Sequence, residues 1–499
     1  MASNSIAAID FGIIIVYVLM LLGVGYYIYR RETSFEEYLL AGRSMTTPVL
    51  ICTLASTYYG LDVLFGSSEL AYNDGIVAFF GYSLLTLVVY LFAAVALAKR
   101  LRNENFTSLP EILERNYGRS TASIGAIGSL LYSLPTTSLF AIGRLCEVVF
   151  GIEAHYGALL LGGVALAYTL MGGLMAVAIT DTIQFVLMSI TVAIGVPLLM
   201  MEIGGFDAVQ AAAPDGYFEP FGSLPIWLML SYASLSLAIL VDPGFYQRIF
   251  AAKSATQARN AMLGAIFVWT AYDWIVAAGG MLAMAAVAAQ LLPVDMHTND
   301  ALLMAVMHAL PVGLTGIFLA GVLATAMSTM DSYTLVAGAN ISYDLYRPII
   351  NPQATDKELV RVTKFGVVAA WVLGFVVAFS FERIMALLVF VMTILTATVL
   401  VAIMVSIFYK GCKTALAGLL SCGTGLISVL VFYVVIAQMG EYDDVYGTYI
   451  WSFTSAGGTF SIWQEYSLFF CLPLSALGFL IGNQFGADYA TGQNDKVST

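Results

Sequence analysis

The feature that most constrains this chain is the recurrence of apolar segments of about 20 residues from one end to the other, the length of helix that crosses a bilayer. The composition agrees, because 60% of the 499 residues are hydrophobic and only 10% are charged. A soluble domain has about 25% charged residues. The sequence therefore predicts an all-α polytopic membrane protein with about thirteen transmembrane helices. We place them near 8–29, 47–73, 76–98, 120–150, 155–175, 177–203, 223–247, 260–290, 312–341, 362–381, 385–409, 414–438 and 463–485.

The basic residues are distributed unevenly over the stretches between these segments. Cytoplasmic loops of membrane proteins hold an excess of Lys and Arg. With the amino terminus outside, 18 of the 20 basic residues fall on the inner side, and the exceptions are Arg144 and Arg383. We therefore predict a multi-pass protein of the cell membrane, surrounded by lipid, with a cytoplasmic carboxyl terminus. The net charge of −12 then lies mostly on outer loops, where it either draws cations or reflects a salty habitat.

Composition also limits the other classes of function. The five cysteines lie in or beside predicted helices without the spacing of a metal site, so we interpret them as packing residues. Nothing indicates a soluble catalytic domain, and we predict neither enzymatic activity nor a nucleic-acid partner. The first apolar run ends in Arg30-Arg31, which is typical of a retained helix. The sequence indicates no particular oligomeric state, and we expect a disordered tail at 486–499.

An acid and several hydroxyls interrupt the apolar run of the ninth predicted span, 312–341. Such groups have no place in hydrocarbon, so they must face protein, water or ions. At about 3.6 residues per turn the hydroxyls share one stripe of the helix. Oxygen ligands of these kinds suit a hard cation such as Na⁺; alternatively, the hydroxyls bond to their own helix or to a neighbouring one. The stripe consists of Thr325, Ser328, Thr329 and Ser332, with Asp331 at its edge.

Two other predicted spans carry residues that interrupt a helix. In the second span Gly60 and Gly66 flank Asp62, which predicts a break whose free carbonyls and amides point at a cargo. Close packing of helices is the other reason for glycine there. In the seventh span Asp242-Pro243-Gly244 interrupts the helix, because proline removes a backbone donor and disrupts the preceding turn.

The two breaks lie about 180 residues apart, and each opens a set of five predicted spans. Interrupted helices in corresponding positions are typical of transporters built on inverted repeats. We therefore predict one integral membrane transporter domain over 1–485. Its parts are an extra amino-terminal helix with an inner loop (1–46), a first repeat (47–203), a second repeat (223–409) and accessory helices (410–485).

Several stretches along the chain resemble the sodium:solute symporter family, in the right order. They are Tyr-Leu-Leu-Ala-Gly-Arg-Ser-Met at 38–45, Tyr-Thr-Leu-Met-Gly-Gly at 168–173 with Thr-Asp-Thr-Ile-Gln at 180–184, Gln-Arg-Ile-Phe-Ala-Ala-Lys-Ser at 247–254, and Met-Ser-Thr-Met-Asp-Ser at 327–332. The resemblance implies the leucine-transporter fold, with broken first and sixth repeat helices, and sodium-driven uptake of small solutes. A finer likeness, near Tyr168, Gln247, Asp331 and 354–358, is to the high-affinity choline transporter branch.

The resemblance also implies where sodium binds. Its first site takes backbone carbonyls of Ser56 and Tyr59, the carbonyl of Thr325, and the hydroxyls of Ser328 and Thr329. A second sodium, present in some members, falls on Asp181, Asp331 and Ser332, together with the Ser328 hydroxyl. Two alternatives stay open for the acids: Asp181 makes a structural hydrogen bond with the hydroxyl stripe, or neighbouring carboxylates share a proton that substitutes for sodium.

For the cargo site, this chain matches the pattern of the choline branch only in part. The choline branch surrounds a quaternary ammonium with aromatic rings. Tyr58 falls on one of these cage positions, but the other positions that align are Leu134 and Asp242. We instead predict that a cationic cargo is held between the two breaks by a pair of carboxylates. The predicted substrate site is Tyr58, Gly60, Asp62, Phe65, Asp242 and Tyr246.

The alternative for this pair is structural: Asp242 ends a helix, and Asp62 pairs with Arg144, which we interpret as the one comparable base at membrane depth. The predicted function is a sodium-coupled secondary active symporter that imports a small organic solute, with an amine or quaternary-ammonium-like cation favoured. The alternatives are a neutral or anionic solute (amino acid, carboxylate or vitamin), proton coupling, and a transporter-like solute sensor. A channel is disfavoured because no carbonyl filter or ring of charges is evident.

Overall fold

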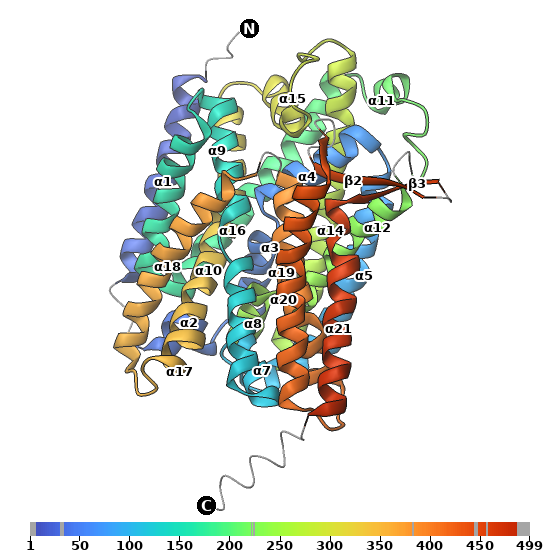
Figure 1. Ribbon diagram of the computed structural model, residues 1–499. Helices are drawn as coiled ribbons and strands as arrows, with labels where there is room; N and C mark the ends of the chain where they lie inside the picture. The colour runs from blue at the N-terminus through green and yellow to red at the C-terminus, as the bar shows by residue number, and fades with distance from the viewer. Residues whose placement is uncertain are drawn as a thin grey trace, which may run out of the picture.

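The computed structural model describes residues 6–29, 34–220, 222, 225–381, 384–443, 448–455 and 458–486, except for a few side chains, among them that of Asp62. The predicted tail therefore lies, apart from Gly486, outside the described residues, as do Arg30, Arg31 and Arg383. Long helices stand side by side to form a bundle (Figure 1).

The helices of the first half of the chain are α1 (Ala8–Tyr29), α2 (Phe35–Leu40), α3 (Thr47–Tyr58), α4 (Leu61–Asp74), α5 (Leu84–Phe92), α6 (Ala98–Asn103), α7 (Leu109–Tyr117), α8 (Arg119–Tyr132), α9 (Thr136–Phe150), α10 (Ala154–Glu202) and α11 (Phe206–Ala212). Those of the second half are α12 (Ile226–Ser234), α13 (Pro243–Ala251), α14 (Ala255–Ala288), α15 (Ala301–Ala309), α16 (Leu314–Ala339), α17 (Arg347–Ile349), α18 (Asp356–Ala378), α19 (Ile384–Phe408), α20 (Ala415–Met439) and α21 (Ser467–Phe485). Among the shorter helical segments, Leu235–Val241 is a 3₁₀ turn after α12, and Asn340–Tyr346 extends α16 as a π-helix.

Eleven helices of the described chain are long and apolar enough to cross a membrane, or twelve if the bent pair α3 and α4 forms one span. The predicted number was thirteen, and the difference of one lies in α10, which we expected as two spans. Its 49 residues are interrupted at Gly173, where φ is 52°. The count of thirteen and the two five-helix repeats stay predictions.

The two arms of α10 run in opposite directions along α1. Before the interruption, Tyr168 lies against Gly25 and Gly172 lies against Ile28. After it, the amide of Gln184 donates to the hydroxyl of Tyr17 at 3.0 Å, which is back toward the start of α1. The chain therefore reverses near Gly173, where only glycine adopts such a backbone conformation without strain.

The extra helix α1 also fixes the start of α16. Asp10 is 2% exposed, and its Oδ1 accepts the backbone N–H groups of Gly313 and Gly316, each at 2.7 Å. A carboxylate in this place satisfies donors that have no partner within the helix. α16 is almost entirely buried, and it packs against α1, α3, α10 and α18. The polar stripe predicted on α16 is therefore at the centre of the bundle.

One element was not predicted. Three antiparallel strands, β1 (Glu441–Asp443), β2 (Thr448–Ser455) and β3 (Gly458–Trp463), lie between α20 and α21 and pair in that order. Trp451 opposes Ile462, and Phe453 opposes Phe460 across the β2–β3 pair. This small sheet projects at one edge of the bundle, and the fold otherwise has the predicted all-α class (Figure 1).

Candidate ion and solute site

The site begins at the interruption between α3 and α4. α3 ends at Tyr58, α4 begins at Leu61, and the two helices are bent by 58°. Gly60 is extended at the break, with φ −74° and ψ 170°. The backbone carbonyls of the last turn of α3 therefore lose their partners within the helix and become available to other groups.

Four of the five oxygens that we predicted for sodium are connected by three contacts of hydrogen-bonding distance. The hydroxyl of Ser328 donates to the carbonyl of Ser56 at 2.8 Å and lies 3.2 Å from the carbonyl of Thr325. The hydroxyl of Thr329 is 3.2 Å from the same carbonyl of Thr325. All four residues are buried. The fifth residue, Tyr59, is positioned by its hydroxyl, which donates to Asp273 at 3.0 Å.

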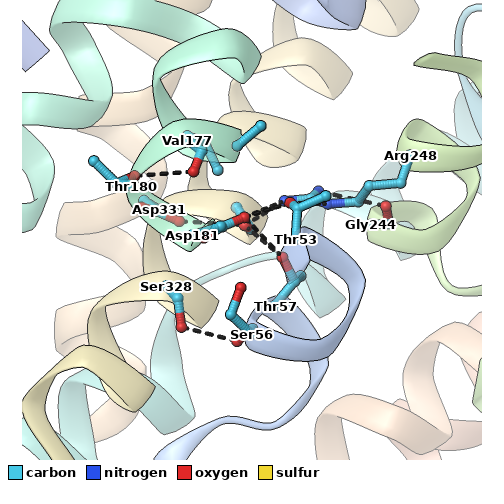
Figure 2. A network of polar contacts seen from close by, with 12 residues as sticks. Thr53, Ser56, Thr57, Val177, Thr180, Asp181, Gly244, Arg248, Ser328 and Asp331 are labelled. Atoms are coloured by element: carbon cyan, nitrogen blue, oxygen red, sulfur yellow. Dashed lines mark hydrogen bonds and ion pairs between the residues drawn. The ribbon is translucent and has the colours of Figure 1, made fainter. Parts of the chain in front are cut away.

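The acids form a second polar cluster beside these oxygens (Figure 2). Asp181 is fully buried, and its Oδ2 accepts hydrogen bonds from Thr53 and, at 3.5 Å, from Thr57. Thr57 also contacts the hydroxyl of Ser332 at 2.9 Å. Ser332 in turn donates to Oδ1 of Asp331 at 3.2 Å. The structure thus brings Asp181, Asp331 and Ser332 together between α3, α10 and α16; their role as a second cation site stays a prediction.

Arg248 lies in the middle of this cluster, and its place there was not predicted from the sequence. Its side chain is fully buried, and Nη2 lies 3.6 Å from Oδ2 of Asp181. Its Nη2 donates to Ser332, and its Nε donates to Thr53 at 3.3 Å. The distribution of Lys and Arg predicts that Arg248 lies in an inner loop with most of the other basic residues. The available signal was its position six residues after Asp242 and directly after the predicted seventh span, 223–247.

The prediction that Arg144 is the one base at membrane depth is therefore wrong. The guanidinium of Arg144 forms ion pairs with Asp300 at 2.7 Å and with Glu147 at 2.8 Å. The alternative partner that the sequence suggested for Arg144 is Asp62, whose side chain lies outside the described part of the chain.

The acid cluster retains unused acceptor oxygens. Within the described structure, Oδ1 of Asp181, Oδ2 of Asp331 and Oε1 of Gln184 are buried without a hydrogen-bond donor. Two carboxylates face a single guanidinium. A buried carboxylate that lacks a counter-charge is costly, so the arrangement can hold one further monovalent cation or a proton.

Two small cavities meet at Tyr58. One is lined by Tyr58, Tyr132, Leu134 and Tyr333, together with Thr329 of the predicted sodium site. The same cavity therefore touches one of the residues that we predicted to bind sodium. Rings of this kind can bind a cation on their faces.

Asp242 stands behind this cavity and has no exposed surface. Its Oδ2 accepts from the hydroxyls of Tyr132 and Tyr333 at 2.6 and 2.8 Å, and its Oδ1 accepts from the backbone N–H of Phe245 at 2.8 Å. Asp242 is thus the N-cap of α13, as the structural alternative held, and it also places a negative charge behind two tyrosines of the cavity.

The second cavity is lined by Tyr58, Tyr59, Tyr90, Trp269 and Asp273, among others. The ring of Tyr58 lies 5.2 Å from that of Tyr90, 5.6 Å from that of Trp269 and 5.0 Å from that of Phe245. Tyr90 and Trp269 were missed because they lie on spans without a helix break.

Of the predicted substrate residues, Tyr58 lines both cavities, whereas Gly60, Phe65, Asp242 and Tyr246 line neither. Phe65 is 1% exposed and packs in the core. The hydroxyl of Tyr246 donates to the carbonyl of Leu240 at 2.7 Å, which turns that side chain away from the cavity lined by Tyr58.

The helical bundle, the broken helix and the buried oxygens define an ion-coupled membrane transporter. The chain belongs to the sodium:solute symporter family, whose profile matches residues 38–422. The members of this family and the relatives of this chain are transporters and not enzymes. Membership of the family accordingly indicates sodium-coupled symport of a small solute by a multi-pass membrane protein.

Two characterised relatives are similar over most of the chain. The high-affinity choline transporter 1 of Caenorhabditis elegans is 25% identical over 381 residues, covering 70% of this chain and 63% of the relative, which is less than two thirds of its length. The sodium/proline symporter of Staphylococcus aureus is 26% identical over 457 residues, covering 87% of this chain and 88% of the relative.

Solved structures show the same fold. A Na⁺-coupled sialic acid symporter superimposes with a TM-score of 0.77 at 16% identity, covering 97% of this chain and 99% of that one. A nucleobase-cation-symport-1 family transporter superimposes with a TM-score of 0.50 at 12% identity. The prediction of a leucine-transporter-type fold is confirmed by these similarities.

Proposed function

We propose that the protein imports a small organic solute that carries a positively charged nitrogen, driven by sodium through alternating access. The observation that carries this proposal is the buried carboxylate of Asp242. It lies behind Tyr132 and Tyr333, whose rings line the same cavity as Tyr58. A cation bound against these rings is stabilised by their negative faces and by the carboxylate of Asp242 behind them.

The relatives support the same class of cargo. Choline carries a quaternary ammonium, and proline carries a protonated amine in its zwitterion. The transporters of these two solutes are similar to this chain at 25% and 26% identity. The shared chemical feature of the two solutes is the charged nitrogen, and this is the feature that the proposal assigns to Asp242. We retain Asp62 as its partner from α4 and replace Phe65 and Tyr246 by Tyr132 and Tyr333.

For the coupling ion, we propose that Na⁺ binds the carbonyls of Ser56, Tyr59 and Thr325 and the hydroxyls of Ser328 and Thr329. The short distances among four of these groups support the proposal, since a Na⁺ ion with oxygen ligands needs several of them to converge. Thr329 also lines the solute cavity, so bound solute and bound sodium would both contact this residue.

For Asp181, Asp331 and Ser332 we propose a second cation position. Either sodium or a proton would neutralise the carboxylate that Arg248 does not. Proton coupling is the alternative that this pair of acids favours, because close carboxylates share a proton readily. We also propose that the protein lies in the cell membrane with its amino terminus outside and its carboxyl terminus in the cytoplasm. The distribution of Lys and Arg supports this orientation.

The cargo class is tested by solutes that differ only in charge. Choline and 3,3-dimethylbutan-1-ol have the same shape, but the second has carbon in place of the charged nitrogen. We expect choline, in the presence of Na⁺, to raise the melting temperature of the purified protein by mass action, and the neutral alcohol to have no effect. Proline and cyclopentanecarboxylate give the same comparison for an amino acid. Equal stabilisation by the members of a pair with and without the positively charged nitrogen would contradict the proposal.

A further inference from the structure

Arg248 is a cation that the protein supplies to its own acid cluster. Its guanidinium lies 3.6 Å from Oδ2 of Asp181, and both side chains are fully buried (Figure 2). The same nitrogen, Nη2, donates to Ser332, which is a ligand of the proposed second cation. Arg248 thus occupies one side of the position that a transported cation would take.

A guanidinium and a sodium ion cannot share this carboxylate without cost. Two positive charges within a few ångströms repel strongly where little water screens them. Asp181 also has only one oxygen, Oδ1, that is without a donor in the described structure. A cation that binds Asp181 fully must therefore displace Arg248 from Oδ2, and Arg248 must displace that cation when it returns.

The helix that carries Arg248 also carries the carboxylate behind the solute cavity. Asp242 is the N-cap of α13, and Arg248 lies on the same nine-residue helix. Gly244 joins the two groups: its carbonyl accepts from Arg248 at 3.4 Å, and a Cβ there would lie 3.1 Å from both Asp242 and Tyr333. Tyr333 lines the solute cavity. A change in the cavity that moves Asp242 therefore moves Arg248.

The other end of α13 is held in place. The amide of Gln247 donates to the carbonyl of Leu39 at 3.0 Å. Met45 pairs with the end of α13 through a hydrogen bond from its backbone N–H to Ala251 at 3.1 Å and one from Lys253 to its carbonyl at 2.9 Å. α13 is thus a short helix that is anchored at its carboxyl-terminal end beside the segment before α3, whereas its amino-terminal end lies at the solute cavity.

We propose that Arg248 is a tethered competitor of the coupling cation at Asp181. While Arg248 holds Oδ2, Asp181 binds no transported cation. When α13 moves with the solute cavity, Asp181 exchanges the guanidinium for a cation, and the return of Arg248 expels that cation. Arg248 is a positioning residue that sets cation affinity and release. This inference rests on the proposed sodium-coupled function.

The test is the binding of radioactive sodium to the purified full-length protein. Arg248→Gln removes the competing charge and keeps hydrogen-bonding capacity. We expect the sodium concentration for half-saturation to fall at least about tenfold, the effect of one full charge next to a buried site. The dissociation of sodium should slow by a similar factor, and one additional sodium should bind per protein. A merely structural role would weaken sodium binding and speed its dissociation.

Three further variants complete the experiment. Arg248→Lys keeps a competing charge and should bind sodium as the unaltered protein does. Arg144→Gln is the matched control, because it removes an arginine that pairs with acids away from the cluster, and it should leave sodium binding unchanged. If Arg248→Gln does not fold, Asp181→Asn and the double variant Asp181→Asn/Arg248→Gln replace it, because the double variant removes both charges of the Arg248–Asp181 pair. These two should bind sodium equally.

Two outcomes separate the inference from the function on which it rests. If the unaltered protein binds sodium, but Arg248→Gln binds it with the same affinity, dissociation rate and number of ions, the competitor role is wrong and the sodium-coupled function stands. A difference between Asp181→Asn and the double variant also overturns the role. If the unaltered protein binds no sodium in K⁺-containing buffer, the proposed function itself fails.

Discussion

At the scale of single residues, the site depends on oxygens that a broken helix releases. The carbonyl of Ser56 accepts the hydroxyl of Ser328 instead of an N–H of its own helix. This contact joins α3 to α16 at a point where both segments are buried. The sodium site proposed here is therefore made from two helices that are far apart in sequence.

The hydroxyl of Ser328 provides the first residue-scale prediction. Ser328→Ala removes one of the five proposed ligands. The loss should weaken the free energy of sodium binding by about 1–1.5 kcal/mol, so the half-saturating sodium concentration should rise about tenfold. Radioactive sodium binding measures it. Ser342→Ala is the matched control, because Ser342 is equally buried and bonded, at 2.6 Å, to Thr363 outside the site. Unchanged sodium affinity in Ser328→Ala would remove Ser328 from the site.

Asp242 provides the second residue-scale prediction. Asp242→Asn removes the negative charge but leaves a residue that caps helices equally well, so α13 should still form. We expect sodium-dependent binding of choline or proline to weaken at least about tenfold, from the loss of one charge near the cation. Asp10→Asn makes the same exchange at another helix start, remote from the cavity, and should leave solute affinity unaltered. Equal affinities in the two variants would exclude Asp242 from solute recognition.

The residues of the site were predictable to different degrees. Ser56, Thr325, Ser328 and Thr329 could be predicted because polar groups in an apolar span stand out and because the family pattern aligns with them. Arg248 could not, since a basic residue near the end of a span looks like a loop residue until its burial is known. Tyr132 and Tyr333 were missed for another reason: tyrosine is common in membrane helices, and only their shared contact with Asp242 distinguishes them.

At the scale of elements, the interruption of α10 has a defined cause. Gly173 has φ 52° and ψ −157°, a conformation that other residues avoid. The sequence predicted two spans here from length, and the structure shows arms that reverse along α1. The same sequence did not predict the sheet between α20 and α21, because short strands in a loop between two spans lack the long apolar runs that reveal helices.

Gly173 provides the element-scale prediction. Gly173→Ala should destabilise the protein by about 1–3 kcal/mol, because a Cβ is disfavoured at this backbone conformation. The yield of monodisperse protein and its melting temperature in detergent should both fall. Gly163→Ala lies on the same element with no atom within 4 Å of the added Cβ, and should be tolerated. A melting temperature of Gly173→Ala equal to that of Gly163→Ala would contradict the interpretation of α10 as a hairpin that depends on this glycine.

At the scale of the whole molecule, the fold was the easiest property to predict. Apolar segments of membrane-spanning length determine the helices, and the order of family motifs determines the fold that the sialic acid symporter shares. The number of spans and the internal symmetry are harder, because neither length nor composition shows where a long helix turns back. The cargo is hardest, since it depends on a few side chains brought together from distant helices.

The central claim is that this protein couples sodium to the uptake of a solute with a charged nitrogen. A flux measurement tests both parts of this claim together. Protein in liposomes is given an inward sodium gradient, and the uptake of radioactive choline and proline is followed over time. We predict that at least one of them accumulates transiently above its outside concentration, and that a potassium gradient produces no accumulation. Uptake that is the same under sodium and potassium gradients, and that follows an imposed proton gradient instead, would contradict the sodium-coupled mechanism.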